Sequence, residues 1–234
     1  MENKLLVIMP LYNTAKFLEA AVESVLQQTY QNFELIIVND CSTDNSLEVL
    51  RQYNNHPKVS VISNSKNRGC YFSRNRALKL AEEKEWEFFT IHDSDDLSDI
   101  SRFTKILKHF QDPSVLGVKP TYVAVTPELK PKRVHAGEGQ SFFRRVVFDK
   151  ILGYYDNTNF SGDTDYWWRL EAYCEMNPKF NTYISTEQLY LRVEHGNNLT
   201  TLIPTKDRLP YFNKKRSEIL QMKKNNSFYR SYVN

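Results

Sequence analysis

Residues 4–97 alternate short, continuously apolar runs with segments in which apolar residues recur at helical spacing, and this alternation restricts the fold more than any other feature. Strands buried on both faces of a parallel sheet are continuously apolar, and helical crossovers join them. The pattern therefore predicts an α/β fold with a mostly parallel sheet flanked by helices. The predicted strands are 4–9, 33–38, 58–63 and 86–92, and the helices between them begin near Phe17, Thr43 and Tyr71.

The alternation becomes less regular after residue 97. Apolar spacing predicts a helix from Ile100 to Phe110. It predicts another over 163–176, whose acidic first turn suits the helix dipole. The remaining predictions are a strand at 115–125, a polar loop at 126–140 and a strand that turns into a helix at 141–152.

Composition excludes several classes of protein. Hydrophobic residues make up 41% of the 234 residues and charged residues 25%, which allows a substantial core and excludes global disorder. The net charge of +3 is too small to indicate a nucleic-acid partner. The three cysteines lack metal-ligand spacing and do not imply disulfides, which favours a reducing compartment. The chain has neither a membrane-spanning apolar run nor a secretion signal at its start, so we expect a cytoplasmic protein.

Polar residues follow each of the four predicted strands in the first part of the chain. Ligands bind beyond the carboxyl ends of an open parallel sheet, so we expect these residues to form one site. They are Pro10, Tyr12 and Asn13; Asn39 and Asp40; Asn67, Arg68, Gly69 and Arg74; and Asp93, Asp95 and Asp96. Together they suit a base, a sugar, a diphosphate and a metal. Each also has a simpler interpretation as a helix cap, a turn or a surface ion pair.

The segment "EFFTIHDSDDL" (87–97) carries the most specific chemistry, because a buried strand ends in three carboxylates, Asp93, Asp95 and Asp96. Crowded carboxylates stay ionised together when a cation lies nearby. Mg²⁺ and Mn²⁺ prefer oxygen ligands and usually bind through one or two carboxylates plus substrate phosphates. On spacing alone the triplet also fits a solvated acidic turn.

Five segments, in the same order, resemble the family 2 glycosyltransferases of the GT-A fold, and the resemblance covers roughly residues 4–200. It implies a Rossmann-like, mostly parallel sheet with a smaller acceptor-binding part. It also implies transfer of a sugar from a nucleotide-sugar, with inversion at the anomeric carbon. The segments are 7–46, "NRGCYFSRNRAL" (67–78), "DSDD" (93–96), "GDTDYWWRL" (162–170) and "LRVEHGNNLTT" (191–201).

The resemblance implies a role for each matching residue. Asp95 or Asp96 would bind the Mn²⁺ or Mg²⁺ that bridges the diphosphate, and the sequence does not rank the two. His195 would complete the metal or phosphate site; it also fits a polar residue on a loop. The residues implied at the nucleotide are Pro10, Tyr12, Asn13, Asp40, Arg74 and Asp93.

Asp163 is the catalytic base that the resemblance implies. In the family a Glu often precedes this position, whereas Gly162 precedes it here. Arg169, six residues on, keeps the family spacing, which aligns Asp163 rather than Asp165. The two aspartates stand at i and i+2 on a predicted helix and point in different directions, so only one is expected to face the donor. The same spacing also fits two acids that merely charge a helix N-terminus.

Trp167 and Trp168 could offer aromatic faces on which an acceptor sugar stacks, or they could be core residues. The expected partners are a nucleotide-sugar donor, most commonly a UDP-sugar, and a glycan, lipid-linked or protein acceptor. The chain lacks the Q-x-x-R-W motif and membrane helices of processive relatives, which favours one sugar per encounter. We expect one compact domain whose parts serve donor binding (1–97), acceptor binding and catalysis (98–205), and a basic helical tail (206–234). The tail fits either a solvated helix or contact with an anionic membrane.

Three other functions fit parts of the pattern. A sugar-phosphate nucleotidyltransferase shares the fold class but needs a glycine-rich loop after the first strand, where "MPLYNTAKF" (9–17) has no glycine. A haloacid dehalogenase phosphatase opens with its D-x-D motif and carries Thr or Val where Leu97 stands here. A carbohydrate-binding module without activity would not need the acidic triplet together with Asp163.

Overall fold

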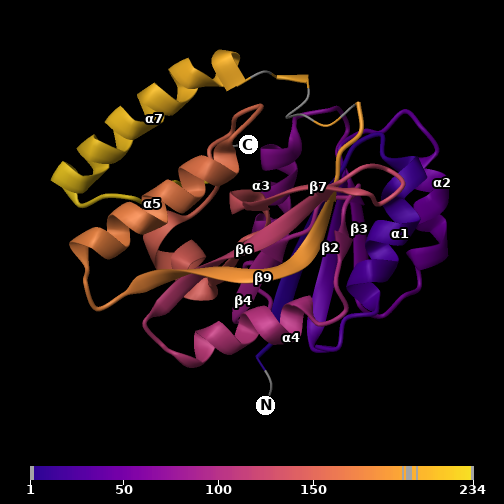
Figure 1. Cartoon of the computed structure of the whole chain (residues 1–234), viewed down its shortest axis with the longest axis horizontal. Coiled ribbons are helices and arrows are strands. Elements are labelled where there is room, and N and C mark those ends of the chain that lie inside the picture. Colours follow the sequence, from indigo (N-terminus) through magenta and orange to yellow (C-terminus); the bar gives the residue numbers. More distant parts are fainter. Residues whose placement is uncertain (1–2, 197, 199–201, 204, 233–234) are drawn as a thin grey trace.

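The computed structural model describes residues 3–196, 198, 202–203 and 205–232 (Figure 1). The strands are β1 (Leu5–Leu11), β2 (Phe33–Asn39), β3 (Val59–Ser63), β4 (Phe88–Ile91), β5 (Leu97–Ser98), β6 (Val115–Val125), β7 (Pro131–Ala136), β8 (Phe142–Arg144) and β9 (Asn181–Val193). The helices are α1 (Ala15–Leu26), α2 (Ser46–Leu50), α3 (Cys70–Ala81), α4 (Arg102–Leu107), α5 (Gly162–Met176) and α7 (Thr205–Asn225). Shorter turns are η1 (Arg51–Tyr53), η2 (Lys108–Gln111), η3 (Glu138–Gln140) and the π-helical η4 (Val147–Leu152).

The strands form one sheet in the order β3-β2-β1-β4-β8-β6-β9-β5, with β7 paired to β6. The first four strands are parallel, so the predicted α/β core is confirmed. β8 then joins β4 in the antiparallel direction and leads to β6. β6 and β9 run parallel to each other over most of their lengths. The sheet thus has a parallel half formed early in the chain and a mixed half formed later.

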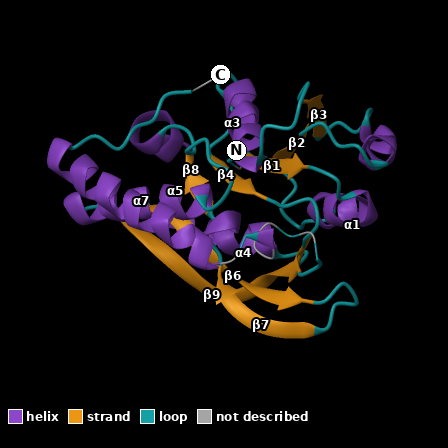
Figure 2. Ribbon diagram, turned by 90° about the horizontal axis from the view of Figure 1, so that it is seen from above, coloured by secondary structure: helices purple, strands orange, loops and turns teal. Residues whose placement is uncertain are grey.

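The two faces of the sheet carry separate hydrophobic cores because alternate residues of a strand point to opposite sides. In β1, Leu5 and Val7 pack in a cluster with residues of α1 and α4. Leu6 and Ile8 pack in the other cluster, with residues of α3 and α5. Figure 2 shows these helices on both sides of the strands. Residues such as Leu5 and Ile8 have no exposed surface, which explains the continuous apolar run in the sequence.

The predicted loop at 126–140 is wrong, because this stretch contains β7 and η3. β7 pairs with β6 in an antiparallel hairpin, and all six of its residues are exposed. A strand without a buried face shows no apolar alternation, so the sequence gives no signal for it. Strand β9 was not predicted either. Its first seven residues have one buried side chain.

The later helices follow the predictions more closely. Residues 141–152 form β8 and then η4, as expected, and α5 begins within one residue of the predicted start. The basic tail forms α7, which lies along α5 (Figure 1). After α7, Arg230 forms an isolated parallel β-bridge with Gly153. Among the described residues, no helix combines the length and apolar character needed to cross a bilayer.

Candidate active site

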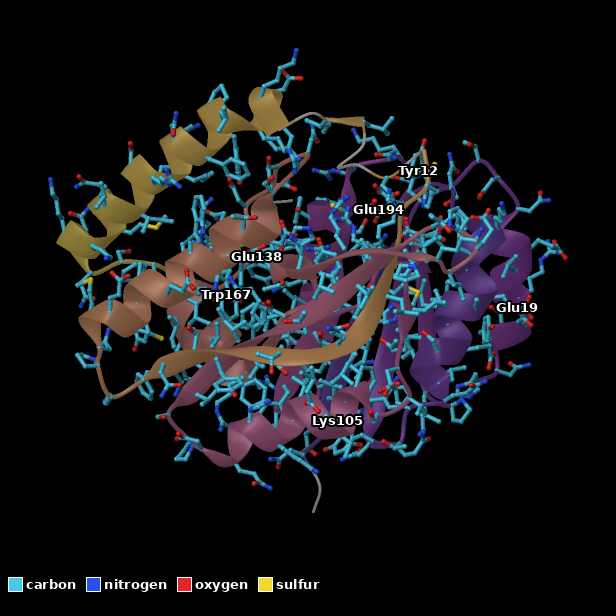
Figure 3. All side chains as sticks on the ribbon, viewed as in Figure 1. Tyr12, Glu19, Lys105, Glu138, Trp167 and Glu194 are labelled. Carbon is cyan, nitrogen blue, oxygen red and sulfur yellow. The ribbon has the colours of Figure 1, made fainter. Side chains whose placement is uncertain are left out.

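The carboxyl end of β1 carries Tyr12, whose ring is exposed, and Asn13, whose side-chain amide is hydrogen-bonded. Tyr12, labelled in Figure 3, is 45% exposed. Asn13 has a φ of 52°, and its Oδ1 accepts the N–H of Thr43 at 2.8 Å. Pro10 lies buried within β1. The β1 loop therefore leaves the tyrosine free for a ligand and uses the asparagine to hold the loop after β2.

Asp40, at the end of β2, fixes the start of α3. Its carboxylate accepts the N–H groups of Arg68, at 3.0 Å, and Gly69, at 2.7 Å. It also accepts the amide of Asn64 at 2.6 Å. Asp40 is 2% exposed, and its hydrogen bonds hold the turn that leads into α3. Gly69 has a φ of +89°, a conformation that glycine adopts readily.

Arg74 and Tyr71 stand three residues apart on α3, so both side chains leave the same face of the helix. Arg74 is 3% exposed, and its Nη2 donates to Oδ1 of Asp93 at 3.2 Å. Its Nε and Nη1 are buried without a hydrogen-bond partner among the described residues. Burial lowers the pKa of Arg74, but neighbouring groups, Asp93 first, outweigh burial and raise it overall. A buried cation with two open N–H groups suits an anionic ligand.

The three acids after β4 differ in their surroundings. Asp93 accepts Arg74 and, through Oδ2, the amide of Gln140 at 3.1 Å. Asp96 is 2% exposed, and its Oδ1 accepts the backbone N–H of Val193 at 2.8 Å. Burial, with the nearby acids, raises the pKa of Asp93 and raises that of Asp96 well above its usual range. These carboxyl groups are thus more easily protonated than isolated ones unless a cation joins them.

Asp95 is the acid of this loop that meets His195. Its Oδ2 lies 2.8 Å from Nε2 of His195 and 3.1 Å from the amide of Asn198. The His195 ring stacks on Phe17, with centroids 4.6 Å apart. The carboxylate of Asp95 suits Mn²⁺ or Mg²⁺ when substrate phosphates supply further oxygens. Within the described part of the chain no three acids, histidines or cysteines form a complete metal cage.

Asp163 and Asp165 face different surroundings, as their spacing predicts. Asp163 is partly exposed, and its Oδ1 accepts the hydroxyl of Tyr71 at 2.9 Å. Asp165 is 1% exposed and accepts a hydrogen bond from Nε of Arg169 at 3.0 Å.

The hydroxyl groups of Thr14 and Ser94 lie 2.8 Å apart and join the β1 loop to the acidic loop. The structure thus brings Arg74, the acidic cluster and Asp163 to one end of the sheet.

The prediction that Trp167 offers a stacking face is wrong, because its side chain has no exposed surface. Its ring belongs to the core between α5 and the sheet. Trp168 is partly buried and packs on α7, with its ring 5.7 Å from that of Phe212. Its role in acceptor binding stays a prediction. The quoted segment 191–201 is described only in part, since residues 197 and 199–201 lie outside the described residues.

Sequence reasoning missed several residues that contact the site. Gln140 binds Asp93 from the stretch predicted as a loop. The hydroxyl oxygen of Tyr190 accepts the backbone N–H of the same aspartate at 3.1 Å, and the amide of Asn198 donates to Asp95 at 3.1 Å. Tyr71 and Asn198 lie within the quoted family segments, so those segments held the only available signal for them.

Comparison with known proteins gives a family. Residues 6–184 match the family model described as Glycosyl transferase family 2. GlyG of Streptococcus pneumoniae is 39% identical over 98 residues, which are 42% of this chain and 32% of GlyG. The putative teichuronic acid biosynthesis glycosyltransferase TuaG of Bacillus subtilis is 32% identical over 139 residues, 58% of this chain and 54% of TuaG. The chain therefore spans about a third to a half of the length of these relatives.

Solved structures with the same architecture support the fold. S. aureus TarS in complex with UDP-GlcNAc matches with a TM-score of 0.68 at 20% identity, over 83% of this chain and 60% of TarS. The mannosyltransferase PcManGT from Pyrobaculum calidifontis, in complex with GDP-Man and Mn²⁺, matches with a TM-score of 0.66 at 18% identity, over 94% of this chain and 62% of PcManGT. At such identities the likeness concerns the fold, and it confirms the predicted GT-A class.

Proposed function

The chain belongs to glycosyl transferase family 2, and from this membership we propose that it moves one sugar from a UDP-sugar to an acceptor hydroxyl group, with inversion at the anomeric carbon. The observation that carries the proposal is the meeting of three groups at one end of the sheet. These are the Arg74–Asp93 pair, the Asp95–His195 pair and the Asp163 carboxylate.

The donor is held, in this proposal, by the residues that follow the first four strands. The exposed ring of Tyr12 is available to stack on the base, with Pro10, Asn13 and Asp40 shaping the pocket. The buried guanidinium of Arg74, whose Nε and Nη1 have no hydrogen-bond partner among the described residues, is proposed to offset the negative charge of the diphosphate. The complex of TarS with UDP-GlcNAc favours UDP as the nucleotide, and the PcManGT complex makes GDP the alternative.

Asp95 and His195 are the proposed ligands of Mn²⁺ or Mg²⁺, and the buried Asp96 is proposed to support the loop. A divalent cation held there would neutralise charge on the departing diphosphate as a Lewis acid. The complex of PcManGT with Mn²⁺ supports this choice of cation. Asp93, already bonded to Arg74, is proposed to face the ribose and the diphosphate.

The proposed chemical step has Asp163 as its base. The acceptor oxygen attacks the anomeric carbon of the donor from the side opposite the diphosphate, and the carbon–oxygen bond to the diphosphate breaks. Asp163 takes the proton of the acceptor hydroxyl as the new bond forms, which is general base catalysis. One displacement inverts the anomeric configuration.

The acceptor is proposed to be a growing cell-surface glycan or its lipid-linked precursor. TuaG is named for teichuronic acid biosynthesis, and GgaB of Bacillus subtilis is named as a minor teichoic acid biosynthesis protein. The outer face of α7 fits an anionic membrane, because Lys206, Lys214 and Lys224 are exposed beside Leu209 and Leu220. Sedimentation with anionic vesicles that weakens in high salt supports this contact, and no sedimentation at low salt argues for a solvated helix.

The test of the proposed function is UDP release from UDP-sugars in the presence of Mn²⁺. We expect release by the wild type and a loss of about a hundredfold or more in Asp163→Asn, since a general base contributes on that scale. UDP binding by the variant, followed by calorimetry, should stay close to wild type because Asp163 does not hold the nucleotide. Normal turnover by Asp163→Asn contradicts the assignment of the base. If no nucleotide-sugar that is offered is turned over, the proposal that this site transfers a sugar is contradicted.

A further inference from the structure

Tyr71 reaches from the first turn of α3 to the first turn of α5. Its hydroxyl donates a hydrogen bond of 2.9 Å to Oδ1 of Asp163, and the residue is 4% exposed. Burial, followed by the charge of Asp163, holds the pKa of Tyr71 well above its ordinary value. The phenol therefore keeps its proton and remains a donor to the carboxylate.

Gly162 provides the surface on which the Tyr71 ring lies. A Cβ atom at Gly162 would stand 2.8 Å from Cδ1 of the ring and 3.0 Å from Cε1. Contacts this short require the ring to move, so a larger residue at this position and the present place of Tyr71 exclude each other. Gly162 therefore leaves the space that the Tyr71 ring occupies.

The two oxygens of the Asp163 carboxylate have different contacts. The N–H of Thr164 also bonds to Oδ1, at 3.0 Å. In the part of the chain that the structure describes, Oδ2 has no hydrogen-bond donor. It lies 2.9 Å from the point where a Cβ atom at Gly139 would stand. One oxygen is therefore held by two donors, and the other faces the turn η3 across a position without a side chain.

We propose that Tyr71 is a positioning residue of the transfer reaction, whose hydroxyl fixes the Asp163 carboxylate so that Oδ2 meets the acceptor hydroxyl. Gly162 and Gly139 leave the space that this orientation needs. The inference rests on the proposed role of Asp163 as the base. The guanidinium of Arg74 lies over the same ring, with its Cζ 4.9 Å from the ring centroid. One turn of α3 thus orients both the base and the cation at the diphosphate.

The experiment compares Tyr71→Phe, which removes the hydroxyl and keeps the ring, with the wild type. We expect kcat to fall about ten- to a hundredfold, because a hydrogen bond to a charged group contributes on that scale. KM for the donor and UDP affinity should not change, since Tyr71 touches neither in this arrangement. Gly162→Ala should lower kcat in the same way with the hydroxyl still present, because the ring can no longer lie flat on α5.

The matched control is Tyr155→Phe, another buried tyrosine, whose ring centroid lies 6.2 Å from that of Tyr71. It leaves the contact between Tyr71 and Asp163 in place and should keep the wild-type kcat. Wild-type kcat in both Tyr71→Phe and Gly162→Ala, beside an inactive Asp163→Asn, overturns the inference and leaves the base intact. A Tyr71→Phe variant that loses UDP binding together with kcat also overturns it. Turnover by Asp163→Asn overturns the proposed function first.

Discussion

The loop after β4 contains Asp95 and Asp96, the first turn of α5 contains Asp163 and Asp165, and in each pair the carboxylates have different surroundings. Asp95 and Asp163 are partly exposed and bond to side chains at the end of the sheet. Asp96 and Asp165 are 2% and 1% exposed and bond to a backbone N–H and to an arginine. The two regions therefore divide their acids in the same way, between a partly exposed group, which we propose meets the ligands, and a buried group that holds the fold.

This division separates what each substitution should change. Removing the buried member of a pair leaves its partner unsatisfied, which lowers the free energy of unfolding. Removing the open member should affect binding or turnover and leave stability close to wild type. Stability and activity, measured on the same variants, therefore test the comparison directly.

Asp165→Ala should have the largest effect on stability. Arg169 has no exposed side-chain surface and would keep its charge without the acid beside it. We expect the free energy of unfolding to fall by about 3–5 kcal/mol, as for other buried ion pairs that lose one partner. Urea unfolding followed by circular dichroism measures the change. Asp163→Asn is the matched control, and we expect its free energy of unfolding to equal that of the wild type. Equal stability of the two variants breaks the comparison for α5.

Asp96→Ala and Asp95→Asn test the same division in the loop after β4. Asp96→Ala should lower the free energy of unfolding by about 1–3 kcal/mol, because it leaves the buried N–H of Val193 without its acceptor. Asp95→Asn should instead lower UDP affinity in Mn²⁺ by about tenfold or more, with little change in stability. Calorimetry with and without Mn²⁺ measures the affinity. If the two variants exchange these effects, Asp96 is the metal ligand and Asp95 the structural acid.

Asp156 should give the smallest effect, visible as a pH dependence. It lies 2.5 Å from both Lys215 and Arg230. Burial raises its pKa, but the bond to Lys215 and the nearby positive charges outweigh burial and lower it overall. A carboxyl group with a lowered pKa in the folded state stabilises above its unfolded pKa of about 4, and this contribution is lost as the pH falls further.

Asp156→Asn should therefore be less stable than the wild type by about 1 kcal/mol at neutral pH. The difference should shrink as the pH falls below about 4. Thermal unfolding across this range measures it. A difference that stays constant with pH would mean that the carboxylate charge contributes nothing to the contact between α7 and the rest of the protein.

The sequence predicts the parallel half of the fold because its strands are buried on both faces, as Ile8 and Ile36 are. It predicts the separation of Asp163 from Asp165 because helical geometry fixes the angle between positions i and i+2. It does not rank Asp95 and Asp96, since the ranking depends on the N–H of Val193, 97 residues away. Strand β7 was missed because exposed strands lack an apolar pattern. Trp167 was misassigned because aromatic residues look alike whether they stack on a ligand or on a core.

The pairing of β9 with β6 has a consequence for how the protein acquires its site. Asp95 contacts His195, which lies 100 residues later in the chain, and the backbone N–H of Asp93 donates to Tyr190, which lies 97 residues later. Contacts between such distant residues form late and slowly, because closing long loops costs entropy before the contacts repay it. A chain still on the ribosome, with β1 to β4 already synthesised, therefore holds the acids without their partners. Competence to bind donor should appear at the end of folding, as one event with the docking of β9.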